Sequence, residues 1–332
     1  MRRQIVNRPD QATLHALEGL ALTHPHLIAH DPVAGLVTRA RPARDKVGLV
    51  SGGGSGHEPL HAGFVGTGML DVAVPGALFA SPTALQVQAG TVAADSGRGV
   101  VQIVKNYTGD VLNFRIAGEL AEDEAVLTEV VLVDDDLATD RGDADGPGRR
   151  GTAAVLAVEK ICGAAAEAGA DLAAVAGLGR RVAAGARTLG LALRAGTHPG
   201  AAEPAFVLPD GEIELGVGIH GERGTGRVPF ADADGLVAQL VDPLVAALGL
   251  TRGSPVLVIV NGLGGASPLE LSVAARAAHH RLADLGIAVA RSLVGPYVTS
   301  LDMHGVSVTL LPADDDLLPL WDAPVRTPAL TW

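Results

Sequence analysis

Aromatic side chains, cysteine and long apolar runs are all scarce in this chain of 332 residues. Aromatic residues make up 3% of the chain and apolar residues 48%, so its buried cores must be built from Ala, Val and Leu. The single cysteine, Cys162, excludes an intrachain disulfide and fits a reducing compartment. No run approaches the ~20 apolar residues of a membrane helix, and the N-terminus lacks the apolar segment of a signal peptide. We therefore expect a cytoplasmic protein that makes no membrane contact.

Positive charge is scarce as well. The formal net charge is −12, which argues against a nucleic-acid partner, because such proteins concentrate positive charge. Lysine occurs only at Lys46, Lys105 and Lys160, and every other basic side chain is an arginine. Where arginine is the default, a lysine at the end of a strand suggests a need for its compact amine.

One stretch is unusually rich in glycine: residues 51–59 read Ser-Gly-Gly-Gly-Ser-Gly-His-Glu-Pro. The apolar run Val47–Val50 before it predicts a buried strand that leads into a glycine turn. The P-loop pattern requires Gly-Lys-Ser/Thr, and the dinucleotide and nucleophile-elbow patterns require glycine where His57 stands, so none of the three applies. Amides of such a turn can converge on an oxygen-rich ligand, and histidine, present here as His57, is the side-chain type that ordinarily titrates near neutral pH. The stretch therefore predicts a polar small-molecule site, with tight packing as the purely structural alternative.

Strand-like and helix-like segments alternate, which predicts an α/β fold of two domains, each a largely parallel or mixed β-sheet flanked by helices. The predicted helices are residues 11–22, 81–94, 152–168, 172–193, 236–248 and 268–285. The predicted strands are residues 47–50, 69–74, 99–104, 125–133, 205–208, 212–217, 255–260, 287–293 and 306–311. Residues 197–204 contain two prolines and no apolar periodicity, so we place the domain boundary there, giving domains 1–195 and 196–332.

Three further side chains are candidates for chemistry. Lys105 ends an apolar strand and is either a Schiff-base lysine or an ordinary surface lysine. Asp110 follows a Thr-Gly turn and is either a helix cap or a general base. His220 lies between Gly218 and Gly221, which leave space around the imidazole and favour a ligand contact. The histidines at 24, 26 and 30 are interrupted by proline and lack a helical carboxylate pattern, so we predict no metal site.

A series of motifs runs in order along nearly the whole chain: residues 51–59, 61–64, 68–70, 79–82, 104–110, 112–114, 216–222 and 301–303. This series resembles the substrate-binding subunit of dihydroxyacetone kinases. The resemblance implies that His220, in Gly-Ile-His-Gly, binds the substrate carbonyl as a hemiaminal, so Lys105 becomes a hydrogen-bond donor to the substrate. It also implies that His57 and Asp110 form an acid/base pair at the phosphorylated hydroxyl. The residues that it assigns to the backbone cradle are Gly54, Ser55 and Gly56.

We find no Walker motif, kinase-type glycine loop or magnesium-binding carboxylate cluster in the sequence, so the nucleotide is expected on a partner, and the resemblance implies which one. It implies that Mg-ATP or Mg-ADP is held by a separate helical nucleotide-binding subunit, that the phosphotransferase system is an alternative phosphoryl donor, and that the chain forms a homodimer. The substrate is expected to be dihydroxyacetone, with a four-carbon ketose such as erythrulose as a close alternative. A non-catalytic ketone-binding regulator is the rival from another class. The presence of His57, Lys105, Asp110 and His220 together favours the kinase.

Overall fold

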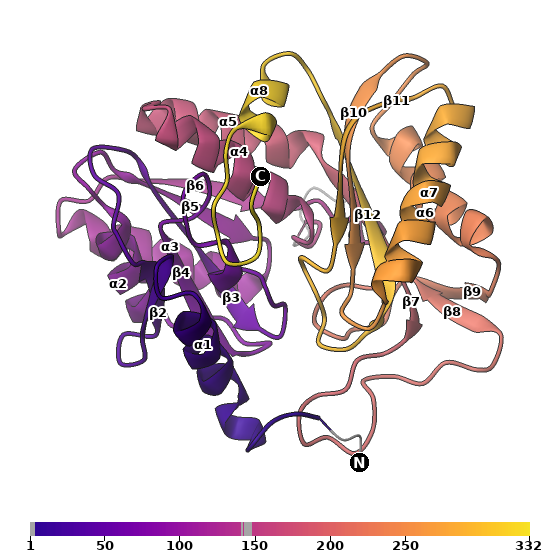
Figure 1. Cartoon of the computed structure of the whole chain (residues 1–332), viewed down its shortest axis with the longest axis horizontal. Coiled ribbons are helices and arrows are strands. Elements are labelled where there is room, and N and C mark those ends of the chain that lie inside the picture. The colour runs from indigo at the N-terminus through magenta and orange to yellow at the C-terminus, as the bar shows by residue number, and fades with distance from the viewer. Residues whose placement is uncertain (1–3, 141, 143–147) are drawn as a thin grey trace. The chain divides into compact units, whose positions relative to one another are not determined.

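The computed structural model describes residues 4–140, 142 and 148–332. These residues form two compact units (Figure 1). One unit comprises Val6–Val133, Val155–Ala183 and Asp316–Trp332, and we call it the glycine unit because it holds the glycine-rich stretch. The other is built mainly from Asp134–Ala154 and Ala184–Asp315, and we call it the His220 unit.

The glycine unit contains a six-stranded mixed sheet in the order β1-β2-β4-β3-β5-β6. Its strands are β1 (Ile28–Asp31), β2 (Leu36–Arg39), β3 (Gly48–Ser55), β4 (Val72–Leu78), β5 (Val100–Lys105) and β6 (Thr128–Val133). Strands β3 to β6 pair in parallel, whereas β1 and β2 add an antiparallel edge. The helices of this unit are α1 (Ala12–Thr23), α2 (Ala84–Ala94), α3 (Thr108–Glu122), α4 (Ala154–Glu167), α5 (Leu172–Gly185) and α8 (Leu317–Asp322).

Alternation along β5 determines which face of this sheet each side chain occupies. Val100 and Val104 pack in a core cluster with residues of α2 and α3. Because successive side chains of a strand point to opposite faces, Ile103 and Lys105 belong to the other face. Val131, the register partner of Ile103, lies on that face next to Gly179 of α5. Lys105 is therefore directed to the side of the sheet that α4 and α5 cover.

The His220 unit contains a second six-stranded sheet in the order β11-β10-β12-β7-β8-β9. Its strands are β7 (Arg187–Arg194), β8 (Glu212–Leu215), β9 (Gly226–Pro229), β10 (Pro255–Gly262), β11 (Ala288–Gly295) and β12 (His304–Pro312). Helices α6 (Ala233–Ala247) and α7 (Pro268–Asp284) pack on this sheet around a core of Leu, Val and Ala side chains (Figure 1). The α/β class with two mixed sheets flanked by helices is thus confirmed.

Two element predictions are wrong. Residues 172–193 do not form one helix, because α5 ends at Gly185 and residues 187–194 form β7. Leu189 and Leu191 alternate with small residues, and their burial between β12 and α6 outweighs the helix-like composition. Residues 205–208 form no strand.

The compact units also differ from the predicted domains 1–195 and 196–332. Strand β7 joins the sheet of the His220 unit through its pairing with β12, and residues 316–332 return to the glycine unit. The return is fixed by backbone hydrogen bonds from Arg326 to Thr67 and from Ala329 to Gly63. A division by sequence position cannot represent a chain that crosses between units more than once.

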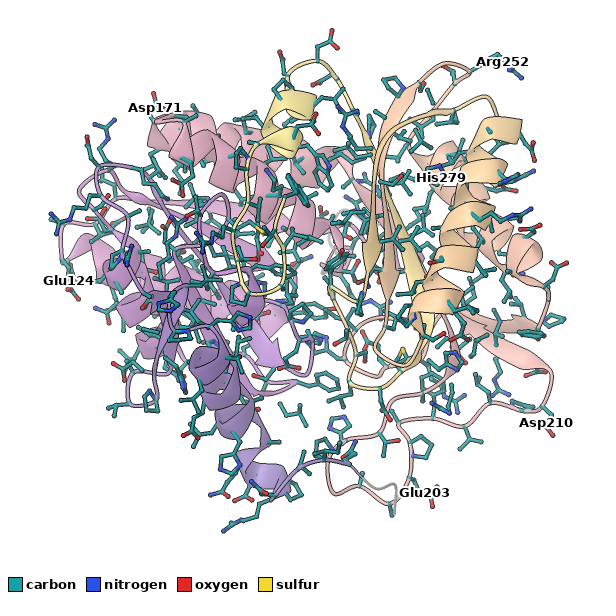
Figure 2. All side chains as sticks on the ribbon, viewed as in Figure 1. Glu124, Asp171, Glu203, Asp210, Arg252 and His279 are labelled. Atoms are coloured by element: carbon teal, nitrogen blue, oxygen red, sulfur yellow. The ribbon has the colours of Figure 1, made fainter. Side chains whose placement is uncertain are left out.

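Charged side chains such as Glu124, Asp171 and Arg252 lie at the periphery of their unit and are exposed (Figure 2). A few charged side chains are instead fully buried in the glycine unit, among them Lys105 and Glu159. Buried charges of this kind require partners, and they define the candidate site. Among the described helices, none is long and apolar enough to cross a membrane.

Candidate functional site

The glycine-rich stretch is strand rather than turn for most of its length. Strand β3 continues through Ser55, so the glycines expected in a turn lie within the sheet. A Cβ atom on Gly53 would lie 2.5 Å from Lys105 Nζ and 3.3 Å from Asp110 Oδ2, and one on Gly54 would lie 2.6 Å from the amide nitrogen of Ala80. Glycine is thus required here because side chains and backbone from neighbouring segments approach β3 closely.

Two members of the predicted cradle already have partners within the chain. The Ser55 hydroxyl donates to the Gly76 carbonyl at 2.7 Å, so it fixes the end of β3. The amide of Gly56 donates to both carboxylate oxygens of Glu58, at 3.0 and 3.1 Å. An amide that binds a carboxylate is suited to an oxygen ligand, as the sequence predicted, but here the chain supplies the oxygen.

Lys105 is held in a fully buried position at the end of β5. Its ammonium donates to the Gly52 carbonyl at 3.1 Å and to His61 Nε2 at 2.8 Å, and it lies 3.8 Å from Asp110 Oδ2. Burial lowers the pKa of Lys105, while the carboxylates of Asp110 and Glu159 raise it. An ammonium has three donors, and two are used by the described residues, so one remains for a ligand beside Gly53.

Two residues that the sequence analysis did not assign complete this cluster. His61 Nδ1 lies 2.6 Å from Glu159 Oε1, and both side chains are buried. Burial and the nearby Lys105 hold the pKa of His61 well below its usual value, so the ring is neutral at pH 7. With Lys105 donating to Nε2, the ring proton is on Nδ1 and is donated to Glu159. The available signals were a Glu-Lys pair in the middle of the mainly apolar helix 152–168 and the place of His61 in the motif 61–64.

Asp110 lies in the first turn of α3 and is 2% exposed. Tyr107 occupies the N-cap position of this helix, so Asp110 is not its cap. Its Oδ1 atom is buried and accepts no hydrogen bond from the described residues, whereas Oδ2 faces Lys105. A buried carboxylate oxygen without a donor is suited to accept a hydrogen bond from a bound hydroxyl group.

His57 is fully buried and stacks on Phe79, with ring centroids 5.1 Å apart. A Cβ atom on Gly56 would lie 2.5 Å from the Phe79 ring, so glycine at this position allows the stack to form. His57, Lys105 and Asp110 therefore all belong to the glycine unit, around the end of β3.

His220 lies in the His220 unit, in the loop that follows β8, and is half-buried. Its amide donates to Glu222 Oε2 at 2.8 Å, and Glu222 Oε1 accepts from Arg150 Nη1 at 2.8 Å. A Cβ atom on Gly218 would overlap the Glu222 carboxylate. A side chain at position 218 would therefore displace the carboxylate of the Arg150–Glu222 ion pair, which is a different effect from the clearance around the imidazole that the sequence suggested.

The His220 loop resembles the His57 turn in one respect. In each, a glutamate one or two residues after the histidine accepts a hydrogen bond from the backbone amide two residues before that glutamate. Gly56 donates to Glu58, and His220 donates to Glu222. In the His220 unit, Arg150 also binds the Gly216 carbonyl at 3.0 Å and Asp136 at 2.6 Å, and burial raises the pKa of Asp136 to about 6. The loop that carries His220 is thus fixed by charged groups on either side of it.

Comparison with known proteins identifies a family. A family model described as the Dak1 domain matches residues 18–329. The chain belongs to the Dak1 family. All the candidate residues described above lie within the matched range.

Relatives in the Dak1 family cover the chain almost completely. It is 43% identical to the dihydroxyacetone-binding subunit of the PEP-dependent dihydroxyacetone kinase of Escherichia coli, over 99% of each chain. It is similar in structure to a dihydroxyacetone kinase operon co-activator, with 31% identity and a TM-score of 0.90 over 95% of this chain and 97% of the other. The dihydroxyacetone kinase of C. freundii, solved in complex with AMP-PNP and Mg²⁺, has 33% identity and a TM-score of 0.87 over 98% of this chain but 60% of its own.

Proposed function

We propose that this chain is the substrate-binding subunit of a dihydroxyacetone kinase. The observation that carries the proposal is the buried pair beside Gly53, in which Lys105 has a donor to spare and Asp110 has an acceptor oxygen without a donor. A small polyhydroxy ketone offers an oxygen for the first and a hydroxyl proton for the second. The match with a subunit named for binding dihydroxyacetone supports the same substrate.

His220 is proposed to hold the substrate covalently. The unprotonated imidazole nitrogen adds to the carbonyl carbon, and the C=O π electrons move to the oxygen. The other ring nitrogen releases its proton and the oxygen takes one up, so a hemiaminal forms without loss of atoms. A tether of this kind compensates for the few contacts that a three-carbon ligand can make. It also selects ketones against alcohols such as glycerol, which have no carbonyl to attack.

Asp110 is proposed to accept the proton of the terminal hydroxyl as that oxygen attacks phosphorus, with His57 as the second member of the acid/base pair. The P–O bond to the leaving group breaks as the new one forms, and positioning supplies most of the acceleration. Mg-ATP or Mg-ADP is proposed to be held by a helical partner subunit, with ATP or the phosphotransferase system as the source of the phosphoryl group. We further propose that the chain acts in the cytoplasm as a homodimer.

Intact-mass measurement tests the covalent step. Incubation with dihydroxyacetone should raise the mass by one whole triose, and His220→Ala should abolish the gain, whereas His280→Ala, which removes an exposed histidine, should not. A gain of one triose minus water, mapped to Lys105, would identify a Schiff base and refute the assignment. Repeating the incubation with erythrulose compares the four-carbon alternative directly.

A turnover assay tests whether phosphoryl transfer requires a nucleotide-binding partner. The purified chain with ketone, Mg²⁺ and ATP should form no phosphorylated product, and adding a helical nucleotide-binding subunit, or the PEP-dependent phosphotransferase components, should restore turnover. Robust ATP-dependent turnover by the isolated chain would contradict the proposal.

The similarity to an operon co-activator supports a second function, in which the chain binds a ketone and regulates without phosphorylating. We favour the kinase because the E. coli kinase subunit is more similar in sequence and because Asp110 has a vacant acceptor, which adduct formation alone does not need. Adduct formation without turnover in the presence of both partner systems would favour regulation instead.

A further inference from the structure

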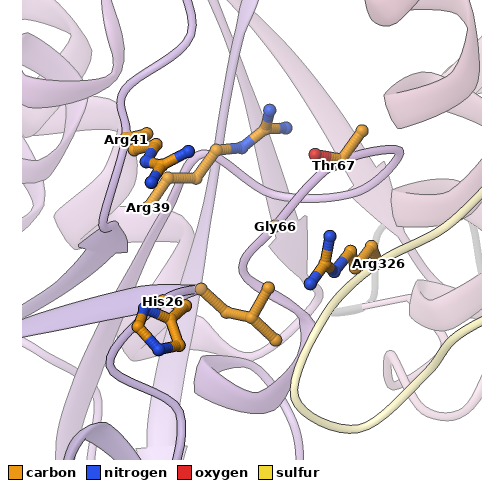
Figure 3. A pocket seen from close by; sticks show the side chains of 7 residues that line it. His26, Arg39, Arg41, Gly66, Thr67 and Arg326 are labelled. Atoms are coloured by element: carbon orange, nitrogen blue, oxygen red, sulfur yellow. The ribbon is translucent and has the colours of Figure 1, made fainter.

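A polar pocket lies in the glycine unit, and neither Lys105 nor Asp110 lines it (Figure 3). Its volume is about 370 Å³, within the range of small-molecule pockets. Four segments form it: the turn before β1, the end of β2 with the residues after it, the loop before β4, and the C-terminal segment. The lining residues are His26, Leu27, Arg39, Arg41, Gly66, Thr67 and Arg326.

Arg39 forms a wall of this pocket but contributes little net charge to it. Its guanidinium lies 2.9 Å from Asp71 and 2.7 Å from Glu167, and Lys46 pairs with the same Asp71 at 2.6 Å. Two cations and two carboxylates thus form a balanced, mostly buried network. The Arg39 guanidinium also donates to the carbonyl of Leu70 at 3.1 Å, which fixes the loop beside the pocket.

Arg41 and Arg326 are different. Within the part of the chain that the structure describes, neither guanidinium forms an ion pair or a hydrogen bond, and no carboxylate lines the pocket. Arg326 is positioned by its backbone, because its amide donates to the Thr67 carbonyl at 2.9 Å. This places the arginine beside the Thr67 side chain on one side of the pocket, with Arg41 on the other (Figure 3). A chain with net charge −12 therefore has a pocket in which two uncompensated cations meet.

We propose that this pocket binds the phosphate group of a small phosphate monoester. Guanidinium groups bind phosphate oxygens through pairs of parallel N–H bonds, and two of them balance a dianion. The Thr67 hydroxyl and the His26 ring supply further hydrogen-bonding groups at the wall. The pocket is larger than a lone phosphate needs, and Leu27 provides an apolar contact for the carbon portion of an ester.

Isothermal titration calorimetry of the full chain with sn-glycerol 3-phosphate tests the proposal. This ester has no carbonyl, so it forms no adduct on a histidine, and the result is independent of the proposed kinase function. We expect saturable binding with a dissociation constant below about 1 mM, weakened when KCl is raised because Arg41 and Arg326 are both exposed. Arg41→Gln and Arg326→Gln should each weaken binding by about tenfold or more.

Arg44→Gln provides the matched control, because Arg44 is an exposed arginine near Arg41 that does not line the pocket. It should change affinity by less than about twofold, since an exposed charge outside the site is screened. Inorganic phosphate, titrated in parallel, separates the two sources of the anion. The proposal is supported if inorganic phosphate binds more weakly than sn-glycerol 3-phosphate. If inorganic phosphate binds as tightly or more tightly, the assignment to an ester is overturned. Absence of saturable binding up to about 10 mM, or unchanged affinity in the Arg41→Gln/Arg326→Gln double variant, overturns the site itself.

Discussion

Replacing His61 by leucine tests the buried cluster on which the position of Lys105 depends. His61 makes two hydrogen bonds, at 2.6 Å to Glu159 and at 2.8 Å to Lys105, and both partners are fully buried. A hydrogen bond to a charged group contributes about 1.5–3 kcal/mol. We therefore expect His61→Leu, which removes two such bonds, to lower the free energy of unfolding by about 3–6 kcal/mol.

The loss should be partly reversed by a second substitution. Without His61, the buried Glu159 carboxyl group loses the ring N–H that donates to Oε1, and leucine of similar volume at position 159 removes that desolvated polar group. The His61→Leu/Glu159→Leu variant should thus be more stable than His61→Leu by about 1–3 kcal/mol. The stability losses of the single variants His61→Leu and Glu159→Leu should together exceed the loss of the double variant.

Urea-induced unfolding at pH 7, followed by circular dichroism and by the fluorescence of the two tryptophans, gives all four free energies. His280→Leu, at an exposed histidine, should change stability by no more than about 0.5 kcal/mol. If the sum of the two single losses equals the loss of the double variant to within about 0.5 kcal/mol, His61 and Glu159 do not act as a unit, and the proposed alignment of Lys105 is refuted.

Three further predictions follow from particular contacts. Asp110→Asn should retain the ketone adduct but lower turnover with the partner subunit by about 10²–10⁴-fold, as measured by coupled assay; near-normal turnover would exclude a general base here. Gly218→Ala should displace the Glu222 carboxylate and cost about 1–3 kcal/mol in urea unfolding, whereas Gly226→Ala, whose Cβ would meet no atom within 4 Å, should not show this loss. Burial lowers the pKa of Lys160 from 10.5 to about 8, so the folded state loses this proton at a lower pH than the unfolded state does. The free energy of unfolding should therefore rise between pH 8 and 10.5 by up to about 3 kcal/mol. Lys160→Met should abolish that rise.

The sequence alone predicted the fold class and the family, which are confirmed, and the residues that the proposed chemistry uses. Apolar runs and helical periodicity are local properties, so α6, α7, β5 and β10 lie close to their predicted ranges. The motifs around His57, Lys105, Asp110 and His220 are also local, and each could be read without knowing what surrounds it.

Tertiary structure decided what depends on partners distant in the chain. Residues 187–194 form a strand because β12 pairs with them, which no local pattern can show. A side chain at position 218 would displace a carboxylate held by Arg150, and His61 acquires its contacts only when α4 brings Glu159 to the end of β5. The arginine pocket exists because the C-terminal segment returns to the loop before β4 and places Arg326 across from Arg41. Charge balance is a property of neighbours in space. Only the folded chain therefore separates the paired Arg39 from Arg41 and Arg326, which form no ion pair with any described residue.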